Sequence, residues 1–411
     1  MDENKKSFLK GAAVSLAIIV IGAFIFNGYK VAWRKRTNAA PEPRQKINEI
    51  VSVLDKFYVD DIDQSKLIET MYSGLVYGVG DPYTTYMNKE EFELFKEQTS
   101  GKYAGIGVVV MADAERNRIR VVSPFEGSPG AQAGILPGDE IIKVNGFDVF
   151  ADQYEEVVSM LRGEPGTSVN LTLYRNSEMK TVDVNVLRRN IDVPTVSHKM
   201  MEDDIGYLRI NGFERTTYAQ FVEAYSDLQT HGMKGLVIDV RNNPGGLLDI
   251  VTKIADALVP KGYIVYTEDK AGKKEYSFSD SRRINMPLAI LVNENSASAS
   301  EVLSGAVQDM KVGVLVGTKT FGKGLVQNLF ELSDGSAVKV TVAKYYTPNG
   351  ICINGEGLIP DHYVDMDKNK SFDLINLAPE DDEQLQAALD IVFEQMAAAE
   401  ETTEATRKDA D

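Results

Sequence analysis

The spacing of apolar residues divides this 411-residue chain into three patterned stretches. In the first, residues 44–98, apolar side chains between positions 47 and 58 recur every three or four residues, as on one face of a helix. A second helix is expected over 65–77, and the Gly-Asp-Pro run at 80–82 ends it. This stretch predicts a helical N-terminal subdomain.

The second stretch, residues 101–189, has short apolar runs separated by turns that contain glycine or proline. Strands are expected over 118–122, 140–144 and 169–174, because the runs are short and β-branched. Within 152–161 the apolar residues instead follow the helical period. The pattern indicates a small β-rich module with one amphipathic helix.

The third stretch, residues 190–398, alternates strand-like and helix-like segments. Such alternation is typical of a mixed sheet with flanking helices, an α/β fold. The expected strands are 205–210, 235–240 and 288–292, the helices 218–229, 247–258 and 384–398, and the hairpin 325–343. The polar, charged end of the chain, residues 399–411, is expected to be disordered.

A further segment, residues 11–29, carries no charge and is just long enough to cross a bilayer as a helix. A cleaved signal peptide is the alternative, but no small-residue cleavage site follows directly, which favours an uncleaved signal anchor. A short tail (1–10) then precedes the span and a linker (30–43) follows it. Basic residues flank both ends, so charge alone leaves the orientation open.

Charge and composition exclude several classes of function. A formal charge of −17 argues against nucleic acid as a partner, because phosphate binding requires a basic surface. The single cysteine excludes an intrachain disulfide. The chain has only three histidines, none in a metal-ligand spacing, which disfavours both a zinc site and a Ser-His-Asp triad. No metal and no organic cofactor is expected.

The most informative chemistry lies between positions 288 and 327. An apolar run ends in a turn, and Ser298 then opens a helical segment, where a hydroxyl lies beside free backbone N–H groups. Lys323, between two glycines, could serve as the base for Ser298 if burial keeps its amine neutral, and Gln327 could hold that amine. The alternative is a capping box, in which Ser298 and Glu301 only begin the helix.

A second candidate element is the double glycine at Gly245 and Gly246, which follows a buried strand and precedes a helix. Without side chains, these residues let backbone N–H groups approach a substrate closely, as an oxyanion site requires. A tight strand-to-helix turn without a ligand is the other interpretation.

The run SASASE, followed by a helix and then by TFGKG and a glutamine, resembles the carboxyl-terminal processing peptidases, or tail-specific serine proteases. The resemblance covers about residues 45–398. It implies that Ser298 is the nucleophile, Lys323 the general base and Gln327 the residue that orients the lysine.

The same resemblance implies that Gly245 or Gly246, together with the amide of Ala299, binds the oxyanion. It also implies an α/β protease core with layering of the crotonase type, and a location outside the cytoplasm. The protein would then be a single-pass protein of the cell membrane, with the protease on the extracytoplasmic side.

The β-rich module resembles a PDZ domain, through the run AGILPGDEIIKVNG at 133–146. PDZ domains bind a C-terminal peptide as an added strand and hold its carboxylate with backbone amides of a loop. Arg162, after the module's helix, is a candidate contact between this module and the protease core. The residues expected in the loop are Tyr103, Ala104, Gly105, Ile106 and Gly107.

These resemblances imply protein substrates with exposed, apolar C-terminal tails. Two alternatives stay open: a PDZ scaffold with an inactive protease domain, and an α/β domain of the crotonase type that binds acyl thioesters. The N-terminal helices are a candidate dimerisation arm, so a homo-oligomer is also considered.

Overall fold

The computed structural model describes residues 42–280, 284–367, 370–371, 374 and 377–408. The chain divides into two compact units, Met1–Gly74 and Leu75–Asp411. The expected membrane span, 11–29, lies outside the described residues. Among the helices that are described, none is long and apolar enough to cross a bilayer.

The N-terminal helices are confirmed. They are α2 (Pro43–Phe57) and α3 (Gln64–Tyr77). Pro43 stands in the first turn of α2, where its missing N–H costs nothing. Neither helix has a buried residue, and apolar side chains such as Val53 and Phe57 are exposed. The apolar stripe of these helices is therefore uncovered in this structure.

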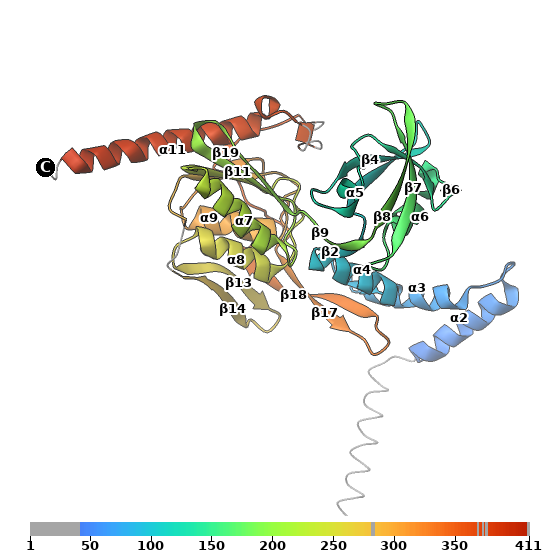
Figure 1. Ribbon diagram of the computed structural model, residues 1–411. Coiled ribbons are helices and arrows are strands. Elements are labelled where there is room, and N and C mark those ends of the chain that lie inside the picture. Colours follow the sequence, from blue (N-terminus) through green and yellow to red (C-terminus); the bar gives the residue numbers. More distant parts are fainter. Residues whose placement is uncertain (1–41, 281–283, 368–369, 372–373, 375–376, 409–411) are drawn as a thin grey trace, which may run out of the picture. The chain divides into compact units, whose positions relative to one another are not determined.

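The centre of the protease core is a mixed six-stranded sheet (Figure 1). Five strands are parallel, and one antiparallel strand, β10, forms an edge. In spatial order the strands are β10 (Val196–Met200), β11 (Ile205–Ile210), β12 (Gly235–Asp239), β15 (Leu288–Val292), β16 (Val314–Gly317) and β19 (His362–Tyr363).

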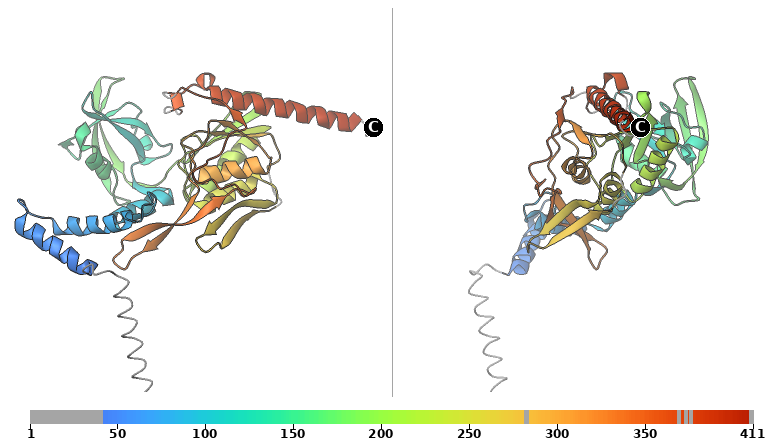
Figure 2. Two further views of the ribbon diagram at one scale, coloured as in Figure 1. Left: turned by 180° about the vertical axis from the view of Figure 1, so that it is seen from behind. Right: turned by 90° about the vertical axis from the view of Figure 1, so that its left-hand side faces the viewer.

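Successive residues of these strands pack against opposite helical layers, as the two-residue period of a strand requires. Leu236 and Ile238 belong to a core formed with α7 (Thr217–Thr230), α8 (Leu248–Leu258) and α9 (Ala299–Asp309). Val237 belongs instead to the cluster under α11 (Glu383–Lys408). Figures 1 and 2 show α11 on one face of the sheet and the other three helices on the opposite face.

A second, antiparallel sheet packs on the far side of α8 and α9. Its strands are β1 (Thr85–Met87), β18 (Ala337–Tyr346), β13 (Gly262–Asp269) and β14 (Lys274–Ser279), with β17 (Leu325–Glu331) also paired to β18. The hairpin expected over 325–343 is thus confirmed as β17 and β18. Helix α4 (Lys89–Ser100) follows β1 and begins with a capping box between Asn88 and Glu91.

The β-rich module has its own apolar core and its own sheet. The strands are β3 (Val108–Asp113), β4 (Arg118–Pro124), β5 (Glu140–Val144), β6 (Phe147–Asp148), β7 (Ser168–Arg175) and β8 (Lys180–Leu187); the helices are α5 (Pro129–Gln132), α6 (Tyr154–Leu161) and the 3-10 turn η1 (Ala151–Gln153). The Asp139 carboxylate of the AGILPGDE run forms a buried, two-bond ion pair with Arg175. This pair fastens the turn to β7.

In two places the structure differs from the local structure expected from the sequence. Residues 399–408, expected to be disordered, continue α11 to Lys408, because no proline or glycine interrupts this run. Tyr103, Ala104 and Gly105 were expected in a ligand-binding loop. They lie in β2 (Lys102–Gly105), which pairs with β9 (Arg189–Asp192) outside the PDZ sheet.

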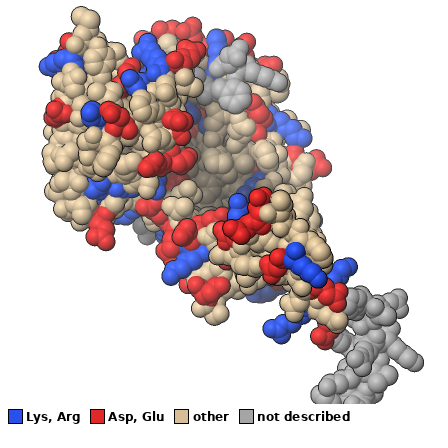
Figure 3. Space-filling view, turned by 90° about the vertical axis from the view of Figure 1, so that its right-hand side faces the viewer, with Lys and Arg blue, Asp and Glu red and all other residues tan. Residues whose placement is uncertain are grey.

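Acidic and basic side chains are interspersed over the face shown in Figure 3, without a continuous basic patch there. This distribution agrees with the formal charge of −17. Electrostatic capture of a phosphate backbone is therefore not a property of this face.

A buried ionic network joins α11 to the sheet. The Arg241 guanidinium, at the end of β12, contacts the carboxylates of Asp239 and Asp382, each with a closest distance of 2.7 Å. Gln384 accepts a further hydrogen bond from it at 3.1 Å. All of these side chains are buried, so the network is stable only while every charge keeps its partner.

Replacing Arg241 with Met should therefore destabilise the core by about 3–5 kcal/mol, because the buried Asp382 carboxylate loses its counter-charge and Asp239 keeps only Arg209, at 3.5 Å. Lys273→Ala, which breaks an exposed ion pair with Glu275, is the matched control. Urea unfolding followed by circular dichroism measures both. Equal midpoints for the two variants would contradict the importance of the network.

Candidate active site

Ser298 lies where the chain turns from β15 into α9. Its φ of 55° and ψ of −112° are unusual for a residue with a side chain, and such strain persists only where the surroundings fix it. It is the residue before the first helical position, and the Glu301 carboxylate accepts its backbone N–H, which is the Glu301 half of the expected capping box. A hydroxyl on such a turn is presented at the N-terminus of the helix.

The three alternating serines differ in what their hydroxyls do. Ser296 donates to the carbonyl of Val240 at 2.8 Å, and Ser300 donates to the carbonyl of Asn243 at 3.0 Å. The Ser298 hydroxyl donates to no residue in the described part of the chain. Ser296 and Ser300 therefore fix the turn, and Ser298 is the one with a hydroxyl available for reaction.

Glu301 connects the serine turn to the lysine loop. One carboxylate oxygen, Oε2, accepts the backbone N–H of Ser298 at 2.9 Å and that of Lys323 at 2.8 Å. The other, Oε1, accepts Gly322 N–H and the Thr320 hydroxyl, both at 2.7 Å. Burial raises the pKa of Glu301, and the hydrogen bonds partly oppose that rise.

The Lys323 amine is partly buried and lies over an aromatic ring. Its Nζ is 4.7 Å from the centroid of the Tyr83 ring. Burial lowers the pKa of Lys323, and Lys339 lowers it further, while Asp81 and Glu301 act in the opposite sense. Among the described residues, none accepts a hydrogen bond from this amine. A lysine with a lowered pKa is suited to act as a base.

Gln327 is close to Lys323 in sequence, but its side-chain amide forms hydrogen bonds to other residues. Its amide donates to the carbonyl of Leu325 at 3.2 Å and to the Thr341 hydroxyl at 3.5 Å. The expected Gln327–Lys323 hydrogen bond is thus absent from this arrangement of the described residues.

The double glycine lies directly beside Ser298. A Cβ at Gly245 would come within 2.8 Å of Ser298 Cβ and 2.9 Å of the Ala299 nitrogen, so only glycine fits. The N–H of Gly245 is already bonded to the Asn243 side chain at 2.9 Å. The two chain neighbours of Gly246 form backbone hydrogen bonds to Phe213. The N–H of Gly246 itself therefore points away from Phe213.

Two amides are therefore suited to bind an oxyanion, those of Gly246 and Ala299. In the described part of the chain, neither N–H has a protein acceptor. Ala299 also stands at the positive end of the α9 dipole. Of the two glycines expected from sequence, the geometry favours Gly246 over Gly245.

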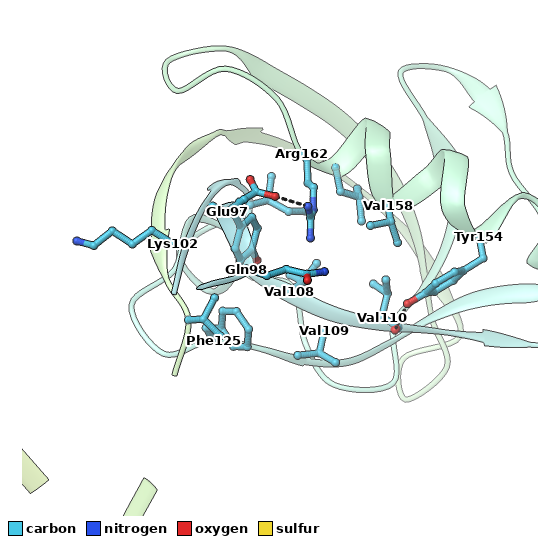
Figure 4. A pocket seen from close by; sticks show the side chains of 15 residues that line it. Glu97, Gln98, Lys102, Val108, Val109, Val110, Phe125, Tyr154, Val158 and Arg162 are labelled. Atoms are coloured by element: carbon cyan, nitrogen blue, oxygen red, sulfur yellow. Dashed lines mark hydrogen bonds and ion pairs between the residues drawn. The ribbon is translucent and has the colours of Figure 1, made fainter. Parts of the chain in front are cut away.

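The PDZ module contains an apolar groove, shown in Figure 4. Strand β3 is an edge strand, paired only with β4, and α6 runs beside it. The cavity of about 320 Å³ is lined mainly by apolar residues, among them Ile106, Val108, Phe125, Val158 and Leu161. An unpaired edge strand beside such a groove can accept an added peptide strand.

Arg162 and Tyr103 lie at one end of this groove together with α4. Arg162 forms an ion pair with Glu97 at 2.6 Å (Figure 4). It also lies over the Tyr103 ring, 5.2 Å from its centroid. Arg162 therefore contacts α4 directly. Ile106 and Gly107, which precede β3, are the members of the expected loop that remain outside a strand.

Sequence reasoning missed two residues of this site. Glu301 was considered only as a helix cap, although its carboxylate holds both candidate catalytic segments. Tyr83 lies directly after the Gly-Asp-Pro run, which was expected only to end a helix and to have no catalytic role. Neither could be found from local pattern, because their partners are distant in sequence.

Comparison with known proteins agrees with this geometry. Residues 204–364 match peptidase family S41, residues 120–175 match the PDZ domain, and residues 29–91 match the N-terminal domain of the activating protease CtpB. The chain belongs to the S41 family of carboxyl-terminal processing serine proteases.

Individual relatives support the assignment over most of the chain. A probable CtpA-like serine protease of Staphylococcus aureus (strain N315) is 38% identical over 90% of this chain and 74% of its own length. The carboxy-terminal processing protease CtpA of Bacillus subtilis (strain 168) is 34% identical, over 90% and 81% of the two chains. The protein is thus a serine-type carboxyl-terminal processing protease.

The fold also has a solved counterpart. A Bacteroides fragilis protein assigned to the S41 proteases superposes with a TM-score of 0.54 at 17% identity, over 86% of this chain and 92% of that one. This similarity concerns the fold alone.

Glu301→Gln should lower kcat by about 100-fold or more, because an amide NH2 group would face N–H donors and displace Ser298 relative to Lys323. Glu294→Gln is the control, since that exposed carboxylate only accepts from Thr318. Cleavage of an unfolded protein, followed by gel densitometry, gives both rates. A Glu301→Gln enzyme as fast as the control would contradict the positioning role.

Proposed function

We propose that Ser298 and Lys323 form the catalytic dyad with which this protease cleaves proteins near their C-terminal tails. The observation that carries the proposal is the serine turn: of the three serines, Ser298 alone has an uncommitted hydroxyl, and it stands beside two free amides. The lowered pKa of Lys323 supports its assignment as the base.

In this mechanism the neutral Lys323 amine takes the proton of the Ser298 hydroxyl while its oxygen attacks the peptide carbonyl carbon. The amides of Gly246 and Ala299 stabilise the resulting oxyanion. The lysine ammonium then gives its proton to the departing amine, and water hydrolyses the acyl-enzyme ester. The Gln327 amide is suited to hold the amine once it has moved towards Ser298.

We further propose that the PDZ groove binds the substrate's C-terminal tail. An apolar groove beside an edge strand favours apolar tail residues, and the substrate carboxylate would meet the amides near Ile106 and Gly107. Arg162 would relay occupancy of the groove to the core, since it is paired with Glu97 on α4.

The location and assembly state are also proposals. The uncharged run at 11–29 supports a single-span anchor in the cell membrane, with the protease on the extracytoplasmic side. The exposed apolar side chains of α2 and α3 support self-association through these helices.

The dyad can be tested with residues 44–411 and an unfolded protein that ends in apolar residues. Ser298→Ala and Lys323→Ala should both abolish cleavage without changing the circular dichroism spectrum. Lys323→Arg should be inactive at every pH, because a guanidinium is not deprotonated. In the unmutated enzyme kcat should rise with pH as Lys323 loses its proton, at a pH below that of an ordinary lysine.

Cleavage that survives Ser298→Ala would refute the nucleophile assignment. An unmutated protein that does not cleave, even with a C-terminal peptide added, would instead support the inactive PDZ scaffold.

The groove can be tested with a ten-residue peptide that ends in apolar residues and a free carboxylate. Val158→Asp should weaken its binding about 10- to 100-fold, because a buried apolar contact is replaced by a charge. Met179→Asp, at an exposed turn of the same domain, is the matched control. Fluorescence anisotropy measures the affinities, and equal binding of the C-terminally amidated peptide would contradict carboxylate recognition.

A further inference from the structure

Tyr83 provides the only ring contact of the Lys323 amine in the described part of the chain. The distance of 4.7 Å between Nζ and the ring centroid is within the range of a cation–π interaction. The amine has no hydrogen-bond acceptor among the described residues, and no described contact joins it to Ser298 or Gln327. In this structure, therefore, no hydrogen bond among the described residues joins the lysine to its proposed reaction partner.

The Tyr83 ring is held in place by its own segment. The Asp81 carboxylate accepts the Tyr83 N–H at 3.1 Å and the Thr84 hydroxyl at 2.6 Å. Thr84 in turn accepts the N–H of Thr341 at 3.1 Å, and β1 pairs with β18 directly after it. The ring position is therefore set by the strand whose Thr341 also holds Gln327.

The charged groups facing the amine come from three elements. Asp81 precedes β1, Glu301 lies on α9, and Lys339 lies on β18. Glu301 already accepts four hydrogen bonds, and Asp81 is bonded within its turn. The face of the Tyr83 ring, 4.7 Å from Nζ, is consequently an available partner for the positive charge.

We propose that Tyr83 is a resting site for the protonated Lys323 amine, in competition with the Ser298 hydroxyl. This inference rests on the proposed Ser298–Lys323 dyad. The ring attracts the ammonium but has little attraction for the neutral amine, because the interaction is with the positive charge. Deprotonation of Lys323 therefore both creates the base and releases it towards Ser298.

A direct consequence is that Tyr83 raises the pKa of Lys323 and opposes the effect of burial. A partly desolvated cation–π contact stabilises the ammonium but not the neutral amine, so it favours the protonated form of Lys323. Tyr83→Leu, which keeps an apolar side chain without the ring, should therefore lower the Lys323 pKa. Tyr83→Phe keeps the ring face and should keep the pKa.

The test measures the pKa without requiring catalysis. Residues 44–411 are treated briefly with acetic anhydride across a pH series, and mass spectrometry quantifies acetylation of Lys323, with the exposed Lys273 as internal reference. A lower pKa in Tyr83→Leu but not in Tyr83→Phe supports the resting site. An unchanged pKa in Tyr83→Leu overturns it, whether or not the enzyme cleaves.

Two additions make the result independent of folding defects and of the dyad. Pentafluorophenylalanine at position 83 keeps the ring shape but removes its attraction for cations. It should therefore lower the Lys323 pKa, as Tyr83→Leu does. If Ser298→Ala abolishes cleavage, the dyad holds, and the rise of kcat with pH in Tyr83→Leu should then move to lower pH together with the Lys323 pKa. Below that rise, kcat should be roughly 3- to 10-fold higher than in the unmutated enzyme. A lower kcat with an unchanged pH dependence would mean that Tyr83 has only a structural role.

Discussion

The candidate active site depends on the buried carboxylate of Glu301. It accepts four hydrogen bonds, two of them from the backbone N–H groups of Ser298 and Lys323 on one and the same oxygen. The proposed nucleophile and the proposed base lie 25 residues apart in the sequence, and no hydrogen bond among the described residues joins the Ser298 and Lys323 side chains. Since a buried charged acceptor tolerates little displacement of its donors, this carboxylate fixes the spacing of the two backbones.

A second buried network connects the loop before the double glycine to the segment that leads into α11. Arg241 begins the loop that leads to Gly245 and Gly246, and its guanidinium is paired with Asp382 just before α11. Asn242, the next residue, donates to the backbone of Ser371 and accepts from Asn293 beside the serine turn. Helix α11 is thus part of the support of the loop that carries the proposed oxyanion amide of Gly246.

The PDZ module and the catalytic segments share an intermediate, helix α4. Its Glu97 contacts Arg162 at the groove, and the segment before it carries β1 and Tyr83. If the groove binds a tail as proposed, a displacement of α4 would reach the preceding segment with Tyr83, which contacts the Lys323 amine. The proposed groove would then influence the proposed base through this connection.

The sequence determined most of the architecture, because helical and strand periods and turn residues are local properties. The strands 205–210 and 288–292 and the helix after Ser298 were predicted with correct type and nearly correct limits. Helix α11 was underestimated at its end, since polarity alone does not exclude a helix.

Tertiary structure alone decided which groups are free to react. Sequence could not show that Ser296 and Ser300 are committed to backbone carbonyls, or that the Gly245 amide is occupied by Asn243. The local sequence also gave no reason to bring Tyr83 to Lys323, across 240 positions. Such contacts depend on how sheets and helices pack, because hydrogen-bond partners and burial are set by neighbours in space and not by neighbours in the chain.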